Sequence, residues 1–586
     1  MIYAIDTETT SLNPHTGGRA FLITICDEYM NTEAIRVGID GFGTLAMKMM
    51  NRDNQFIGHN LGFDLAFLSK LGLDFGERVT LHDTLIAAHL YNPLEPTKRL
   101  KALTEKYLKS TNPEEKALDA WFSANGMKAD GKREYAKVPE EIIVPYALAD
   151  VRMTMSLWKF YRGLGVVDTE VYKFECSLIP VVADIVKQGM KIDKTFAQSE
   201  AERTVSRSLK LAKQITDTYG IQNPGSSDQL AEFLTRAVIL PAGKTQHDYP
   251  LTQGSKDNPT QEPVLSMDAV ALQEYDHPVV PLVLEYRDVI KMNGTYLQPM
   301  LTLTDEEGVL HASLNQTGAR TGRFSSSNPN LQNIPRSGGV VDIRRGFKPK
   351  NPGGSLLLID LSQIELRVLA HYCKEEAMVA ALSQRSGDLH AATAQLMFGE
   401  VTKQFRMIAK TLNFAVIYGA GGKKLRDTIN RALPEANFTL EQTNDFKNKY
   451  YNAFPAVQTF KWKIENLVRQ RAVTHPERIG YVDGVSGRRY LCEAEAAYRI
   501  LNYLVQGESA MYFKKKMLAV QPILKGKRTK LINVVHDELI FDLDKDEEGL
   551  IPVLMKTIED EAMFRVPIYA NAAISSTNWA EKKAIS

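Results

Sequence analysis

Two aspartates, Asp360 and Asp537, adjoin apolar runs that predict buried β-strands. Asp360 ends the run 356–359, and Asp537 lies between the runs 531–535 and 539–541, a pattern typical of a β-hairpin with acidic residues at its turn. Carboxylates on a rigid turn can fix a divalent metal, because hard cations bind oxygen ligands in a fixed geometry. We predict that the two aspartates meet in space and hold two Mg²⁺ ions; the alternative is that each is an ordinary strand-end acid.

A second acidic set lies in the first 165 residues. Asp6 and Glu8 follow a short apolar strand and are two residues apart, so they project from one face of an extended chain. Asp64 falls in the first turn of a predicted helix, and Tyr146 and Asp150 share a face of another. Four such carboxylates could hold two metal ions roughly 3.5–4 Å apart, with the tyrosine orienting the attacking water. Each residue alone would be an ordinary solvated strand end or helix face.

Four residues spaced four apart mark one predicted helix: Arg406, Lys410, Phe414 and Tyr418. They form a slowly drifting stripe with cations at one end and aromatic rings at the other. Such a stripe suits a ligand with a triphosphate and a base, although an amphipathic helix with a basic end is the alternative. The following segment 419–424 is not a P-loop, because it lacks the glycine spacing and a Ser or Thr after the lysine.

The composition is that of an ordinary multidomain globular chain of 586 residues. A formal net charge of +1 means that any DNA binding must come from local basic patches. The four cysteines are scattered without a CxxC pair, which argues against a zinc site or a disulfide framework and for a reducing compartment. No apolar run is long enough to span a membrane, and the N-terminus looks like a first strand rather than a signal peptide. We therefore expect a cytoplasmic protein.

The stretch from 165 to 300 predicts a solvated helical subdomain. Residues 175–192 have helical apolar spacing that ends at a glycine, and residues 240–263 are polar and predict an exposed loop. Arg287 and Lys291 are four apart, so they either face phosphates or form a solvated face. Farther on, the basic run 514–516 predicts a solvated helix face.

The N-terminal acidic set resembles the DEDD family of 3′–5′ exonucleases, tyrosine type. The resemblance rests on DTET at 6–9, GHNLGFD at 58–64 and YALAD at 146–150, in this order, with His82-Asp83-Thr84 also in the family style. It implies an RNase H-like fold with a central mixed sheet over residues 1–165. It also implies that the four carboxylates are metal ligands and that Tyr146 takes part in catalysis.

Residues 311–586 resemble family A, DNA polymerase I-like enzymes. The segments that carry the resemblance are TGRFSSSNPNLQNIP at 321–335, DLSQIELRVLAH at 360–371, RMIAKTLNFAVIYG at 406–419, RR at 488–489 with NYLVQG at 502–507, and HDE at 536–538. The resemblance implies an α+β right-hand polymerase domain over 166–586, following the α/β exonuclease domain. Its thumb would span about 190–300, its palm about 301–375 and 500–586, and its fingers about 376–499.

The resemblance also implies a role for each residue of the metal site. Asp360 would bind both ions, Asp537 would be the second metal ligand, Leu361 would add its backbone carbonyl, and Glu538 would support them. Lys410 would bind the triphosphate and protonate the departing pyrophosphate.

Further residues would bind the substrates. Arg406 would contact the triphosphate, and Phe414 and Tyr418 would stack on the base and sugar; phenylalanine at 414 implies poor use of dideoxynucleotides. Glu365 would exclude a 2′-hydroxyl, and His536 would lie near the primer 3′ end. Three residues would contact the minor groove of DNA: Arg323, Asn502 and Gln506.

We interpret the chain as a template-directed DNA polymerase with proofreading. Expected cofactors are two Mg²⁺ per active site, with Mn²⁺ as a substitute. Expected partners are primer-template DNA and dNTPs, with a helicase-primase or a processivity factor as further candidates, and the chain should be a monomer. The layout starts at the exonuclease without a 5′-nuclease domain, which is phage-like and predicts replication of a phage genome in a bacterial cytoplasm.

Other classes of function stay open. The chain could be an exonuclease whose second half only grips DNA, or an inert DNA-binding scaffold. A reverse transcriptase suits the motif order and the RxxxKxxxFxxxYG helix less well.

Overall fold

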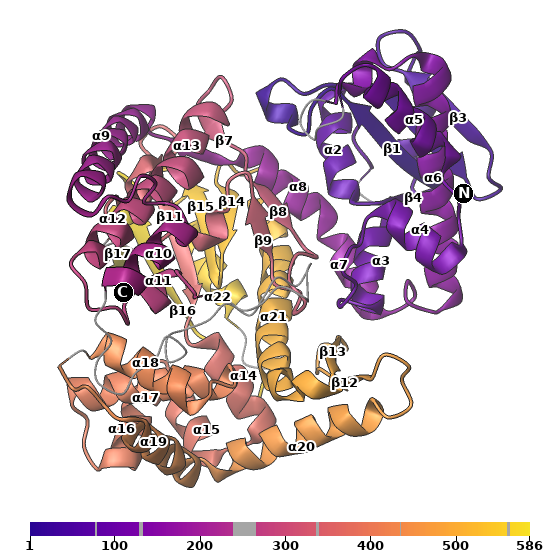
Figure 1. Cartoon of the computed structure of the whole chain (residues 1–586). Coiled ribbons are helices and arrows are strands. Elements are labelled where there is room, and N and C mark those ends of the chain that lie inside the picture. The colour runs from indigo at the N-terminus through magenta and orange to yellow at the C-terminus, as the bar shows by residue number, and fades with distance from the viewer. Residues whose placement is uncertain are drawn as a thin grey trace.

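The computed structural model describes residues 1–76, 79–127, 133–237, 265–335, 339–433, 435–559 and 563–585. Figure 1 shows an N-terminal lobe on one side of a second lobe, whose sheet lies above a group of helices. The predicted exposed loop at 240–263 lies outside the described residues. Among the described helices, none combines the length and apolar character needed to cross a membrane.

The N-terminal lobe is built on a five-stranded sheet of order β3-β2-β1-β4-β5. The central strand β1 runs antiparallel to β2 and parallel to β4, so the predicted mixed sheet is confirmed. The strands are β1 (Ile2–Thr9), β2 (Ala20–Asp27), β3 (Thr32–Arg36), β4 (Gln55–Gly58) and β5 (Thr80–Asp83). The helices around it are α1 (Gly43–Met50), α2 (Leu61–Lys70), α3 (Thr84–Tyr91), α4 (Leu100–Leu108), α5 (Pro113–Ala124) and α6 (Glu140–Gly163).

One buried carboxylate organises the turns that follow β4 and β5. Asp83 accepts the backbone N–H groups of Asn60 and Leu61 at the start of α2, and of Leu85 and Ile86 at the start of α3. An acid at a helix N-terminus satisfies N–H groups that have no partner within the helix. The turn before α2 also requires Gly58, because a Cβ there would lie 2.7 Å from the Leu61 Cβ.

The connector differs from the single helix predicted over 175–192. It forms α7 (Glu170–Ser177) and α8 (Ile179–Gln188), with a break at Leu178, and then β6 (Met190–Ile192). The predicted helix end at Gly189 is confirmed, since this residue takes φ +56° and a Cβ would lie 2.7 Å from the Leu310 carbonyl oxygen. β6 pairs with β10 (Phe347–Lys348) and β7 (Val309–Leu310). These tertiary pairings hold residues 190–192 in a strand, although their apolar spacing predicted the end of a helix.

The next stretch is helical, as predicted. Its elements are α9 (Lys194–Tyr219), α10 (Ser227–Ala237), α11 (Ala269–Leu272), α12 (Val279–Met292), a π-helical turn (Asn293–Leu297) and α13 (Gln298–Thr302). Arg287 donates to the Met267 carbonyl within this subdomain, whereas Lys291 is exposed. In this structure Arg287 is therefore held by the Met267 carbonyl, and Lys291 is the more exposed of the two cations.

A second five-stranded sheet has the order β14-β15-β11-β16-β17. β14 (Lys530–Val535) and β15 (Glu538–Leu543) form the predicted hairpin, and β11 (Ser355–Leu361) lies antiparallel between β15 and β16 (Ala570–Ser575), with β17 (Lys583–Ile585) at the edge. Two short strands, β8 (Ser313–Asn315) and β9 (Ser325–Ser327), pair separately. Helix α8 packs against β14 and α22 (Leu550–Ile558) against β16, whereas α14 (Ile364–Cys373), which follows β11, packs against α21 (Ile500–Leu524).

The helices below the sheet in Figure 1 lie between α14 and α21 in the chain. They are α15 (Glu376–Leu382), α16 (Leu389–Phe398), α17 (Lys403–Ile417), α18 (Gly422–Ala432), α19 (Leu440–Ala453) and α20 (Pro455–Arg471), followed by the β12 (Ile479–Asp483) and β13 (Arg489–Glu493) hairpin.

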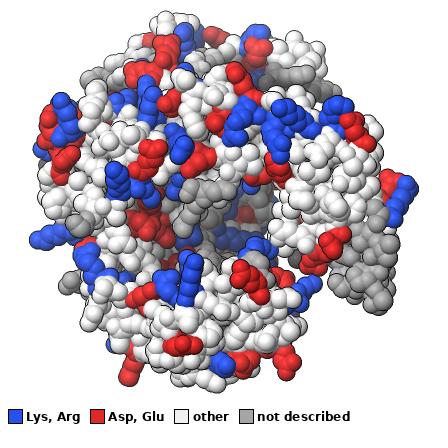
Figure 2. Space-filling view, turned by 90° about the vertical axis from the view of Figure 1, so that its left-hand side faces the viewer, with Lys and Arg blue, Asp and Glu red and all other residues white. Residues whose placement is uncertain are grey.

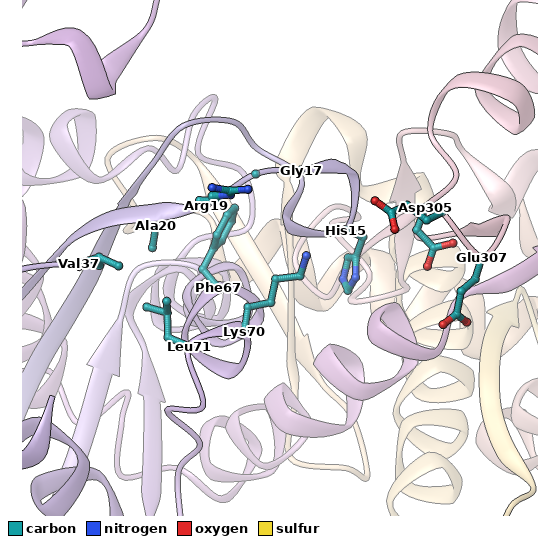
Figure 3. Close-up of a pocket in the computed structure, with 12 residues that line it drawn as sticks. His15, Gly17, Arg19, Ala20, Val37, Phe67, Lys70, Leu71, Asp305 and Glu307 are labelled. Atoms are coloured by element: carbon teal, nitrogen blue, oxygen red, sulfur yellow. The ribbon is translucent and has the colours of Figure 1, made fainter.

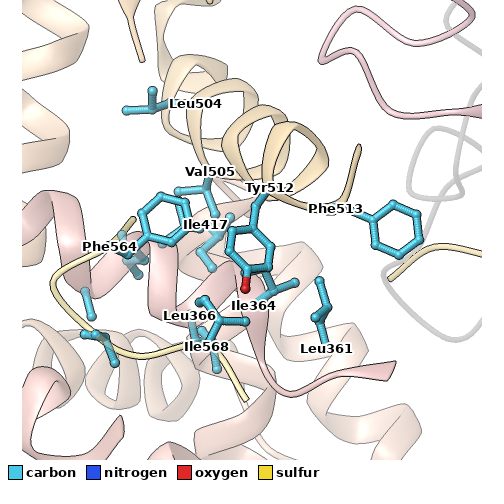
Figure 4. Close-up of a cluster of buried hydrophobic side chains, with 14 of the residues drawn as sticks. Leu361, Ile364, Leu366, Ile417, Leu504, Val505, Tyr512, Phe513, Phe564 and Ile568 are labelled. Carbon is cyan, nitrogen blue, oxygen red and sulfur yellow. The ribbon is translucent and has the colours of Figure 1, made fainter. Parts of the chain in front are cut away.

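An apolar cluster joins these helices to the sheet (Figure 4). Leu361 and Ile364 come from the β11–α14 connection, Ile417 from the end of α17, and Val505 and Tyr512 from α21. All five are buried, and full burial of such side chains contributes about 1.5–3 kcal/mol each. The cluster therefore holds the end of β11, the end of α17 and α21 in one packed unit.

A buried ion cluster joins the connector to α21. The Glu175 carboxylate of α7 lies 2.8 Å from Lys514 Nζ and 3.0 Å from Arg488 Nη1, and it also accepts a hydrogen bond from Gln316. Lys514 is fully buried and only Lys515 of this run is exposed, so the predicted solvated face is wrong for Lys514. Burial lowers the pKa of Lys514, and the Glu175 carboxylate opposes that shift.

Replacing Lys514 by Met should destabilise the fold by about 3 kcal/mol, because removing one partner leaves Glu175 short of compensating charge in the interior. The measurement is the urea midpoint of unfolding. Lys515→Met is the matched control and should leave the midpoint unchanged, because Lys515 is exposed. Equal midpoints for the two variants would contradict the role of the buried cluster.

Candidate active sites

The hairpin turn of the second sheet carries the predicted aspartate. Only His536 and Asp537 separate β14 from β15, and His536 takes φ +55°. Asp360 is paired with Glu538 in the β11–β15 ladder, and the Leu361 N–H donates to the Asp537 carbonyl at 3.0 Å. The structure thus places Asp360, Asp537 and Glu538 together at one end of the sheet.

Two residues for which the sequence predicted no role hold this hairpin in place. Gln332 accepts the His536 N–H at 2.9 Å and donates to the Val534 carbonyl, and it is buried. Lys582 forms an ion pair with Glu538. Gln332 belongs to the segment 321–335 that carried the resemblance, whereas nothing in the sequence around Lys582 indicated its contact.

Arg323 lies between two carboxylates beside the hairpin. Its guanidinium pairs with Glu365 and lies 3.7 Å from Asp537 Oδ1. The Tyr418 hydroxyl donates to the same Glu365 at 3.1 Å. Burial raises the pKa of both Glu365 and Asp537, and Arg323 opposes both shifts. A cation beside Asp537 therefore stabilises its charged form.

Helix α17 presents the predicted stripe. Arg406 and Lys410 are exposed, and the rings of Phe414 and Tyr418 stack with centroids 6.4 Å apart. Arg406 pairs with Asp388 at 2.8 Å in this structure. Because Tyr418 at the end of the helix contacts Glu365, the aromatic end of the stripe lies beside the sheet carboxylates.

The predicted minor-groove residues on α21 extend this set. Gln506 lies close enough to Tyr418 to bond with its hydroxyl, and the Asn502 side-chain oxygen is buried without a hydrogen-bond partner. Arg323, Glu365, Tyr418 and Gln506 therefore form a chain of polar contacts from the hairpin to α21. Asn502 lies one helical turn before Gln506.

Basic and acidic side chains are mixed on the surface, in agreement with the net charge of +1. Figure 2 shows basic and acidic side chains interspersed over one face, which is hollowed between its upper and lower parts, with basic side chains inside the hollow. Any attraction for a polyanion on this face is therefore local.

The N-terminal lobe brings its acidic set together. Asp6 and Glu8 lie on β1, and the Asp64 Oδ1 on α2 accepts the Thr7 N–H at 2.9 Å and the Thr7 hydroxyl at 2.7 Å. Tyr146 and Asp150 come from α6, which packs against β1. All five predicted residues of this set therefore surround one end of the central strand.

The electrostatics of this set indicate that its negative charge is only partly compensated. Burial, then the Asp150 carboxylate, raises the pKa of Glu8 to about 8, and burial raises the pKa of Asp64 to about 7 and that of Asp150 to about 6. The pKa of Asp6 is raised by burial and by the charges of Asp64, Glu8 and Asp150. Buried like charges disfavour ionisation unless a cation joins them.

The donor set fits a hard divalent cation. It is made of carboxylate oxygens, and Asp150 Oδ1 is buried without a hydrogen-bond partner. Within the described ranges no three His, Cys, Asp or Glu side chains are already arranged to hold a metal. The carboxylates of both sites would therefore have to move toward an ion when it binds. This is expected because like charges repel each other when no ion lies between them.

A cavity of about 600 Å³ lies between the N-terminal lobe and the loop before β7 (Figure 3). Lys70 and His15 line one side, and Asp305 and Glu307 line the other. The His15 ring stacks on His311 with centroids 3.8 Å apart. None of the predicted site residues lines this cavity.

Comparison with known proteins adds two family matches. Residues 194–581 match the model of DNA polymerase family A, and residues 3–162 match a 3′–5′ exonuclease model. DNA polymerase I of Helicobacter pylori is 31% identical over 540 residues, covering 90% of this chain and 56% of that protein. DNA polymerase I of Borreliella burgdorferi is 28% identical, covering 99% of this chain and 62% of that protein. The chain thus spans little more than half the length of these curated relatives.

A solved structure has the same fold. The POL domain of Pol1 from M. smegmatis, in complex with DNA primer-template and dNTP, superposes with a TM-score of 0.78. The alignment covers 99% of this chain and 95% of that chain at 22% identity.

Proposed function

Because the chain belongs to DNA polymerase family A and carries a 3′–5′ exonuclease domain, we propose that it is a template-directed DNA polymerase with proofreading. The observation that carries this proposal is the position of Asp360 and Asp537 at one sheet end, beside the aromatic end of the α17 stripe. In this proposal the thumb spans about 190–300, the palm about 301–375 and 500–586, and the fingers about 376–499.

Synthesis would take place at the second sheet. Asp360, Asp537 and the Leu361 carbonyl would hold two Mg²⁺, or Mn²⁺ as a substitute, with Glu538 in support. When bound, the ions would lower the pKa of the primer 3′-hydroxyl and neutralise charge on the triphosphate.

The protein's own groups position the reactants in this proposal. Arg406 and Lys410 bind the triphosphate, and Lys410 donates a proton to the departing pyrophosphate. Phe414 and Tyr418 stack on the nucleotide. Glu365, held by Arg323 and Tyr418, excludes a 2′-hydroxyl.

DNA contacts complete the synthesis site. Arg323, Asn502 and Gln506 contact the minor groove, and His536 lies near the primer 3′ end. When DNA binds, Arg323 would give up its contacts with Glu365 and Asp537 and contact the primer terminus instead.

Proofreading would take place at the N-terminal set. Asp6, Glu8, Asp64 and Asp150 would hold two Mg²⁺ that supply the activated water, and Tyr146 would orient that water against the terminal phosphodiester. A mispaired 3′ end frays more readily than a paired end, which favours its transfer to this separate site.

The comparisons also bear on the partners and on the source of the chain. We propose primer-template DNA and dNTPs as ligands of a monomer, which is supported by the ligands named for the M. smegmatis structure. The relatives described above are bacterial, so replication of a phage genome in a host cytoplasm stays a prediction, as do a helicase-primase and a processivity factor.

Template direction is tested with four primer-templates that differ only in the next template base. With one dNTP at a time and the exonuclease disabled by Asp6→Ala and Glu8→Ala, only the complementary dNTP should extend each primer by one nucleotide. Equal incorporation of all four dNTPs on every template would contradict template direction.

A further inference from the structure

A lysine that sequence reasoning did not single out lies inside the N-terminal acidic set. Lys101 of α4 donates to the Tyr146 hydroxyl oxygen at 2.7 Å, and its ammonium lies 3.3 Å from Asp150 Oδ2. It also lies 3.6 Å from Glu115 of α5 and 3.9 Å from the centroid of the Tyr146 ring. One ammonium thus joins α4, α5 and α6 at Tyr146, which is predicted to orient the water, and at Asp150, which is predicted to bind metal.

The charge of Lys101 reaches the rest of the set. It opposes the upward pKa shifts that burial causes in Asp150, Asp6 and Glu8. The lysine side chain is 19% exposed, so solvent does not fully screen its charge. Among the basic side chains of the described residues, Lys101 has the largest effect on the charges of Asp6, Glu8 and Asp150.

We propose that Lys101 is a positioning residue of the hydrolytic site: its ammonium holds the Tyr146 hydroxyl and Asp150 in place and supplies part of the positive charge that the carboxylates require. This inference rests on the proposed exonuclease function. The ammonium donates to the tyrosine oxygen and pairs with Asp150, and Asp150 also accepts a side-chain hydrogen bond from Tyr146, so the lysine holds the hydroxyl and the carboxylate together.

The position has an opposite consequence for metal binding. A fixed ammonium beside Asp150 repels an incoming divalent cation, so removing the ammonium should strengthen binding of the ion. The same removal frees Tyr146 and should slow hydrolysis, because loss of orientation costs rate even where binding is kept. A residue that only stabilised the fold would not move the two properties in opposite directions.

The test compares Lys101→Met, Lys101→Arg and the unaltered chain. Mn²⁺ binding is titrated by calorimetry on metal-free protein without DNA, and the Asp6→Ala, Glu8→Ala double variant identifies the heat that belongs to this site. We expect Lys101→Met to bind Mn²⁺ about tenfold more tightly at this site. We also expect its kcat on single-stranded DNA to fall about tenfold or more, with little change in KM, and Lys101→Arg to recover part of the rate.

Lys106→Met is the matched control. Lys106 lies on the same helix and pairs with Glu95 at 2.8 Å, outside the acidic set. It should change neither Mn²⁺ affinity nor kcat. Primer extension by each variant monitors folding, because it uses the other proposed site.

Two results would overturn the proposal: unchanged or weaker Mn²⁺ binding by Lys101→Met, or an unchanged kcat. Failure of the proposed exonuclease function is distinguishable, because the unaltered chain would then not degrade single-stranded DNA at all. In that case the Mn²⁺ titration still decides whether Lys101 competes with a cation at this set.

Discussion

Asp537→Asn should lower the rate of primer extension by about 10³-fold or more. The substitution keeps the size of the side chain but removes a charge that the proposed metal pair needs, and a metal contributes several kcal/mol to stabilising developing charge. The turn should survive, because its contacts to Leu361 and Gln332 use backbone groups of Asp537 and His536. The measurement is single-turnover extension of a labelled primer at saturating dNTP.

Degradation of single-stranded DNA by the same variant is the internal control and should match the unaltered chain. Near-normal extension by Asp537→Asn would contradict the assignment of the hairpin aspartate.

Replacing both Asp6 and Glu8 by Ala should abolish degradation of single-stranded DNA, again by about 10³-fold or more. The two carboxylates project from one face of β1 into a set in which burial and then mutual repulsion raise the pKa of each of them. The fold should survive, because the changes remove buried like charges. The measurement is the loss of full-length labelled oligonucleotide over time with Mg²⁺.

Glu33→Ala is the matched control, since Glu33 lies on strand β3 of the same sheet with its carboxylate half exposed beside Lys48. It should leave degradation unchanged. Primer extension by the double variant should also be unchanged, and loss of both activities together would point to misfolding or to a wrong division into domains.

Local patterns predicted the elements that carry the sites. The hairpin around Asp537, the strand that ends near Asp360 and the strand-turn-helix before Asp64 all depend on neighbours in the sequence, so apolar runs and turn residues were enough. The mixed order of the N-terminal sheet came from the family resemblance, because strand periodicity does not say which strands pair.

Contacts across long sequence separations were not predictable in this way. Lys514 looks like part of a solvated basic run, but Glu175 lies 339 residues away and makes its burial possible. Gln332 reaches a hairpin 202 to 204 residues distant, and Lys101 reaches Tyr146 on a different helix. In each case the partner that decides the role of the residue is brought close only by the tertiary fold.

The most direct test of the central claim is one gel with a 5′-labelled primer on a template, with Mg²⁺, with and without dNTPs. The proposed function predicts that the primer lengthens with dNTPs and shortens without them, which requires both sites in one chain. Shortening under both conditions would mean that residues 311–586 only hold DNA, and would contradict the claim.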